Sequence, residues 1–147
     1  ATLADGAELA RKEKAALVYM GHGNERWPSG IYAEAQKMMQ ELYPDVKTYI
    51  GVVEGYPGID EVVEALAEAK SKSKTRKVVL KPFMIVAGDH ALNDMAGDDE
   101  ESWKSALSAK KFQVIPVLKG LGSNDAFARI FVNHIRDAAR DSGIPLQ

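Results

Sequence analysis

The sequence contains no cysteine, and this absence excludes disulfide bonds, zinc–thiolate centres and cysteine nucleophiles from its chemistry. No apolar run approaches the roughly 20 residues that a membrane-spanning helix needs. Basic residues do not gather into a stripe, and 19 Lys and Arg against 21 Asp and Glu leave a formal net charge of −2. A nucleic-acid-binding surface is therefore not indicated.

Motifs for nucleotide chemistry and for serine hydrolysis are also missing. The segment GHG at 21–23 does not extend to GxGxxG, and no Walker lysine follows it. The nucleophile motif GxSxG is absent as well. Neither a nucleotide or flavin cofactor nor a serine nucleophile is therefore predicted.

The 147 residues, 46% of them apolar, suffice for one domain with one core. We expect a linker or N-terminal helix over 1–14 and a single domain over 15–147. The first ten residues lack the charged start and apolar centre of a signal peptide. We therefore expect a cytoplasmic protein; a periplasmic one would need its signal peptide in a missing N-terminal part.

Apolar strand-like segments alternate with amphipathic helix-like segments along the chain. We expect strands at 15–20, 46–53, 77–87 and 112–118, and helices at 31–43, 59–70, 98–109 and 124–143. Pro82 predicts an irregularity in the third strand, and Asn124 and Gly143 predict the cap and the stop of the last helix. The flavodoxin-like order β-α-β-α-β-α-β-α predicts an α/β fold: a four-stranded, mostly parallel sheet with helices on both faces.

Three polar side chains follow the first three predicted strands in turn. His22, Glu54 and His90 each come within a few residues of a strand's carboxyl end. Ligands of open parallel sheets bind beyond these ends, so the three side chains are expected on one rim. Two imidazoles and a carboxylate suit Co²⁺, Ni²⁺, Fe²⁺ or Zn²⁺, and we predict a metal site with open coordination positions.

Other polar and aromatic residues have more ordinary interpretations. His134 falls in the middle of the last helix and is expected to be a surface or packing residue. The acids at 98–101 are interpreted as a solvated helix start, which the helix dipole favours. Trp27, Tyr56 and Met84 either line a flat apolar cleft or belong to the core.

Three stretches resemble a known family: VYMGHG (18–23), GVVEGYP (51–57) and KPFMIVAGDHALNDMAGDDEESWKSAL (81–107). They are similar to the anaerobic sirohydrochlorin cobaltochelatases of the CbiK type. The resemblance implies a class II chelatase, a lyase that inserts Co²⁺ into sirohydrochlorin on the anaerobic route to cobalamin, without ATP. It also implies the ligand set His22, Glu54 and His90, with the two histidines as catalytic groups.

The family's chains are about twice as long, and this sequence resembles their C-terminal half. The resemblance therefore implies a partner: the N-terminal half, or a second copy of this chain in a homo-oligomer. Sirohydrochlorin carries many carboxylates, and we expect Arg26 at the edge of the cleft, with Lys81 and Lys119 behind it. Asp89 is expected to orient the surroundings of His90. Two alternatives stay open: a metal-binding half without catalysis, and a ferrochelatase or nickel chelatase acting on a related tetrapyrrole.

Overall fold

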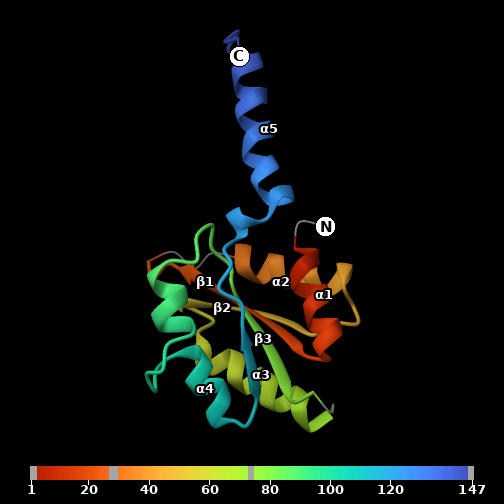
Figure 1. The fold of residues 1–147 in the computed structure, drawn as a ribbon, viewed down its shortest axis with the longest axis vertical. Coiled ribbons are helices and arrows are strands. Elements are labelled where there is room, and N and C mark those ends of the chain that lie inside the picture. Colours follow the sequence, from red (N-terminus) through yellow and green to blue (C-terminus); the bar gives the residue numbers. More distant parts are fainter. Residues whose placement is uncertain (1–2, 27–29, 73–74, 146–147) are drawn as a thin grey trace.

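A computed structural model describes residues 3–26, 30–72 and 75–145. Four parallel strands form one sheet in the order β2-β1-β3-β4 (Figure 1). The predicted α/β class and parallel sheet are thus confirmed. The strands are β1 (Ala16–Gly23), β2 (Thr48–Glu54), β3 (Lys77–Pro82) and β4 (Gln113–Pro116). The helices are α1 (Ala4–Glu13), α2 (Ile31–Leu42), α3 (Ile59–Lys72), η1 (Ala91–Met95), α4 (Trp103–Ala109), η2 (Leu121–Ser123) and α5 (Asp125–Asp141).

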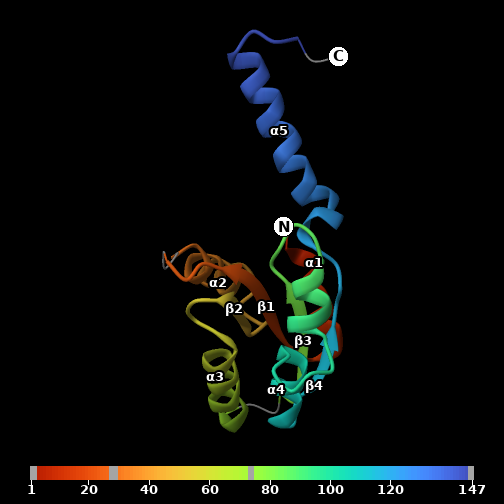
Figure 2. The same ribbon diagram turned by 90° about the vertical axis from the view of Figure 1, so that its left-hand side faces the viewer.

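The strands β1 and β3 lie in the centre of the sheet and are apolar because both of their faces are covered. Odd residues such as Leu17 and Tyr19 point towards α1 and α2, and even residues such as Val18 and Met20 point towards α3 and α4. Helices therefore cover both faces of the sheet, as predicted (Figure 2). Within the described residues, no helix has both the length and the apolarity to cross a membrane.

The N-terminal segment is a packed helix rather than a linker. Ala7 and Ala10 of α1 are 0% and 1% exposed, and α1 lies against β1 and β3. Small residues allow this close approach: a Cβ added at Gly6 would lie 2.4 Å from the Tyr19 hydroxyl oxygen. The helix α1 thus covers the sheet face beside α2.

Two element boundaries differ from the sequence predictions around 77–109. The strand β3 ends at Pro82, which cannot donate a ladder hydrogen bond, and 83–88 forms a loop instead of further strand. The helix α4 begins only at Trp103, because Ser102 caps it by accepting a hydrogen bond from the Ser105 N–H. The acids 98–101 therefore lie in the turn before this helix.

The last helix does not close the domain, contrary to the expectation that it would cover the sheet. Asn124 caps α5 by accepting from the N–H groups of Ala126 and Phe127, and Gly143 follows its end at a φ of 66°, as predicted. The helix then projects away from the α/β body (Figures 1 and 2). The face of the sheet to which α5 could have returned is covered by α1 and α2.

Candidate functional site

Two of the predicted metal ligands, His22 and His90, lie against each other at the carboxyl edge of the sheet. Their ring centroids are 4.9 Å apart and the rings are nearly perpendicular, at 84°. His22 belongs to β1 itself, which continues to Gly23, so the expectation that this histidine lies in a loop after the strand was wrong. His90 precedes the turn η1, which Ala91 and Met95 anchor in the core. The pair thus joins two well-fixed elements.

Both imidazoles have Nδ1 beside an oxygen acceptor. His22 Nδ1 lies 3.2 Å from the Gly23 carbonyl oxygen, and His90 Nδ1 lies 2.5 Å from Asp94 Oδ2. A neutral imidazole that donates from Nδ1 keeps its lone pair on Nε2. A ring of this kind can bind a metal through Nε2, the usual mode for a histidine ligand with a hydrogen-bonded second nitrogen.

Backbone hydrogen bonds from a distant segment hold the loop that leads to His90. The N–H groups of Leu121 and Gly122 donate to the carbonyl oxygens of Met84 and Ile85, at 2.7 and 2.9 Å. The segment that carries α5 is thus tied directly to the loop between β3 and η1.

The sequence prediction missed Asp94 as the partner of His90. Five residues of π-helix form η1, and within this wide turn the Asp94 carboxylate reaches the preceding imidazole. Asp89, which was expected to orient the surroundings of His90, instead accepts a hydrogen bond from Asn93 Nδ2 at 2.8 Å. Residues four apart are neighbours on a helix, so the spacing of His90 and Asp94 would have indicated their contact if a helical turn had been predicted here.

Glu54 is the last residue of β2 and pairs in register with Gly23. Alternation along β2 starts its side chain on the α1/α2 side of the sheet, whereas His22 starts on the α3/α4 side. In the described part of the chain, no three His, Asp or Glu side chains form a group that could hold a metal ion. The Glu54 carboxylate must therefore extend past the end of the sheet to join the imidazoles, and its role as a ligand stays a prediction.

Arg26, expected at the edge of the cleft, and Tyr56 and Met84, expected in the cleft or the core, occupy different environments. Tyr56 is 75% exposed and precedes Pro57 at a cis peptide bond beyond β2. Arg26 is also exposed, and its backbone N–H donates to Asn24 Oδ1. Met84 is partly buried against the core on the α3/α4 side. Trp27 lies outside the described residues.

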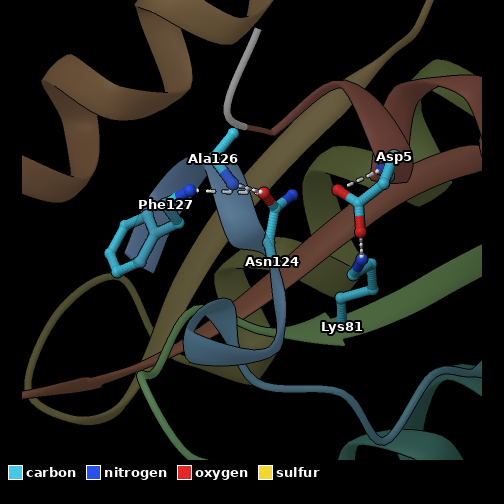
Figure 3. Close-up of polar contacts among 6 residues, drawn as sticks. Asp5, Lys81, Asn124, Ala126 and Phe127 are labelled. Atoms are coloured by element: carbon cyan, nitrogen blue, oxygen red, sulfur yellow. Dashed lines mark hydrogen bonds and ion pairs between the residues drawn. The ribbon is translucent and has the colours of Figure 1, made fainter. Parts of the chain in front are cut away.

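Lys81 cannot serve at the edge of a cleft, contrary to the sequence expectation. Its side chain is 6% exposed, and its Nζ lies 2.5 Å from Asp5 Oδ2 (Figure 3). Alternation along β3 directs it under α1. Lys119, the other lysine expected there, is exposed after β4.

Acidic side chains surround the approach to η1. A cavity of about 300 Å³ adjoins Asp94, and its walls are Asn93, Asp94, Asp99, Glu101 and Ser102. The hydrogen bond from Lys104 lowers the pKa of the exposed Asp98 below its ordinary value. The cavity beside Asp94 is thus lined mainly by acidic side chains.

A parallel α/β sheet places its ligand site beyond the carboxyl ends of its strands, and this chain brings two imidazoles together there, as in the α/β class of ligand-binding domains. Residues 1–140 match the family described as cobalt chelatase (CbiK). The chain belongs to this family.

Curated relatives carry the same description. The chain is 39% identical over 131 residues to the sirohydrochlorin cobaltochelatase of Salmonella typhimurium, covering 88% of this chain and 46% of the relative. It is 35% identical over 128 residues to the sirohydrochlorin cobaltochelatase CbiKC of Nitratidesulfovibrio vulgaris, covering 87% of this chain and 43% of the relative. The matched region thus spans somewhat less than half the length of either relative.

Proposed function

We propose that this chain is half of a sirohydrochlorin cobaltochelatase, which inserts Co²⁺ into sirohydrochlorin on the anaerobic route to cobalamin, without ATP, nucleotide or flavin. The contact between His22 and His90, with Nδ1 of each ring beside an acceptor, carries the proposal. Membership of the cobalt chelatase family supports cobalt as the metal substrate.

Insertion requires a metal that loses water and a macrocycle that loses its pyrrole protons. Two imidazole nitrogens suit Co²⁺ and replace part of its hydration shell. Imidazole also exchanges protons near neutral pH, so His22 and His90 can take up pyrrole protons as the metal leaves them. Glu54 adds negative charge that attracts the cation. Arg26, Tyr56 and Met84 are proposed to contact the tetrapyrrole.

The second wall of the cleft is proposed to come from another chelatase half, on the same polypeptide or in a second copy of this chain. The apolar face of α5 supports this assembly. Ile130, Phe131 and Ile135 are between 39% and 61% exposed, although aliphatic and aromatic side chains of a helix normally pack against a partner. The helix is thus suited to contact a neighbouring body.

Cobalt insertion into sirohydrochlorin, followed by absorbance, tests the activity. The chain is assayed alone and mixed with a separately produced N-terminal half of the Salmonella relative, with and without ATP. His90→Ala should remove most cobalt binding and insertion, whereas His134→Ala, on the projecting α5, should leave cobalt binding by the chain alone unchanged. Unaltered insertion by His90→Ala contradicts the proposal.

The same assay separates the alternatives. Cobalt binding without insertion, alone and with the added half, would favour a metal-binding half without catalysis. Faster insertion of Fe²⁺ or Ni²⁺ than of Co²⁺ would favour a ferrochelatase or nickel chelatase.

Light scattering tests the assembly. A homo-oligomer is expected to fall apart when Phe131→Glu places a charge on the apolar face of α5. The matched substitution Arg129→Glu, on the polar side of this helix, should leave the assembly intact. A monomer at all concentrations, unaffected by the added half, would contradict the proposed partner.

A further inference from the structure

We propose that Asp94 is a positioning residue for His90: its carboxylate keeps the imidazole in the Nδ1–H tautomer, fixes the rotation of the ring and leaves the lone pair on Nε2. This inference deepens the proposed function, on which its cobalt readout rests. In this role Asp94 acts on the metal site through its hydrogen bond to His90 and is not itself a metal ligand.

The contact is short and chemically unambiguous in its direction. Asp94 Oδ2 lies 2.5 Å from His90 Nδ1, and an ionised carboxylate can only accept a hydrogen bond. The proton of a neutral imidazole must therefore reside on Nδ1, which leaves the lone pair on Nε2. The same bond fixes the rotation of the ring about its bond to Cβ.

The backbone around this contact is held by the core. Ala91 and Met95, which flank the turn between the two side chains, are both 0% exposed. The Ala96 N–H donates to the Ala91 carbonyl oxygen at 3.2 Å and closes the turn. The His90 and Asp94 side chains themselves are 39% and 45% exposed, so they are accessible to a metal ion from solvent.

The ring that Asp94 orients is the ring that meets His22. The nearly perpendicular arrangement of the two imidazoles depends on the rotation of each of them. Without Asp94, His90 could rotate and adopt the Nε2–H tautomer, which has no lone pair at the nitrogen that binds metal. Loss of such an outer partner typically weakens metal affinity by about 10- to 100-fold.

A competing explanation is that Asp94 contributes only its negative charge, which would attract cations to this edge. Asp89 provides a matched control, because it lies in the same segment and carries the same charge. It bonds to Asn93 rather than to the imidazole. A charge effect should appear in both aspartates, whereas positioning should appear in Asp94 alone.

The first measurement is the His90 tautomer in the metal-free chain, from long-range proton–nitrogen correlation spectra of ¹⁵N-histidine-labelled protein. The unaltered chain should show the proton on Nδ1. Asp94→Ala should shift the population towards the Nε2–H form, and Asp89→Ala should leave it unchanged. An unchanged tautomer in Asp94→Ala overturns the inference.

The second measurement is Co²⁺ affinity by isothermal titration calorimetry. We expect Asp94→Ala to bind about 10- to 100-fold more weakly and Asp89→Ala to stay within about 3-fold. Asp94→Asn, whose Oδ1 can still accept from Nδ1, should recover part of the loss together with the Nδ1–H tautomer. Equal losses in the Asp89 and Asp94 alanine variants overturn positioning in favour of charge, as does an asparagine variant no better than alanine.

The two measurements also separate this inference from the proposed function. An Nδ1–H tautomer that depends on Asp94, in a chain that binds cobalt but does not insert it either alone or with the added half, would contradict the chelatase and support the positioning role. Cobalt insertion that survives Asp94→Ala at full rate and affinity would support the chelatase and overturn the positioning role. Circular dichroism of each variant verifies that the fold is intact.

Discussion

The ion pair beneath α1 offers a direct test of how the first helix is attached to the sheet. Asp5→Ala removes the carboxylate that lies 2.5 Å from Lys81 Nζ and leaves the ammonium group, whose side chain is 6% exposed, without this partner. The substitution also removes the bond from the Gly6 N–H to Asp5 Oδ1 in the first turn of α1. Both effects destabilise the folded state.

The size of the loss follows from the burial of the two partners. Removing one partner of a fully buried pair costs about 3–5 kcal/mol. The Asp5 side chain is 52% exposed, so water can replace it beside the ammonium and the cost falls below that range. We expect Asp5→Ala to lower the free energy of unfolding by about 2 kcal/mol. For a chain of this size the corresponding decrease in Tm is about 4–8 °C.

Urea and thermal denaturation of two single variants and their combination measure this effect. Lys81→Met replaces the ammonium with an apolar side chain of similar length and should be neutral or stabilising, because a buried pair gains little over apolar packing. In the double variant the loss should shrink to the helix-start contribution of Asp5, about 0.5–1 kcal/mol. A double variant as unstable as Asp5→Ala would refute the reasoning. Lys81→Met should also keep its cobalt affinity, and a large loss would restore this lysine to the site.

Three further substitutions test the edge of the sheet and the core. Gly23→Ala should abolish cobalt binding and destabilise the fold by about 2 kcal/mol or more in urea unfolding, because its φ is 84° and its Cβ would lie 1.9 Å from the Glu54 carbonyl oxygen. Tyr19→Phe should be neutral or raise stability by about 1 kcal/mol in calorimetry, since the buried hydroxyl has no hydrogen-bond partner among the described residues. Gly120→Ala should weaken cobalt binding from a distance and speed amide exchange in the loop before His90, because its Cβ would lie 2.4 Å from the Ile85 carbonyl oxygen.

The sheet could be predicted because its central strands carry a strong local signal. Residues 16–21 of β1 are buried without interruption, and such a run is typical of a strand covered on both faces. Alternation with amphipathic helices then favours parallel pairing. The end of β3 was placed too late because 83–87 is as apolar as the strand itself. Only the missing hydrogen-bond donor of Pro82 indicates that the strand ends there.

The position of α5 could not be predicted because amphipathicity shows only that a helix has an apolar face, not which surface covers it. Ala7 and Ala10 look like part of an alanine-rich linker in the sequence, yet they place α1 on the sheet face that a closing helix would use. A segment before β1 thus determines that the segment after β4 projects outwards. Because α1 and α5 are far apart in the sequence, neither segment alone shows which of the two covers that face of the sheet.

In the site, too, the strand order could be predicted from the sequence, whereas the directions of individual side chains could not. His22 and His90 could be brought together from the sequence because parallel strands end at one edge whatever their exact lengths, and errors in both boundaries did not separate them. The directions of the side chains could not be predicted as well as the order of the strands. Lys81 was expected at the edge of the cleft because the substrate carries carboxylates, although alternation along β3 directs it under α1. Asp94 depends on a π turn that no periodicity signals, and it contacts the histidine that topology alone had already placed. Backbone order therefore predicts which groups meet, and the irregular turns decide how they face one another.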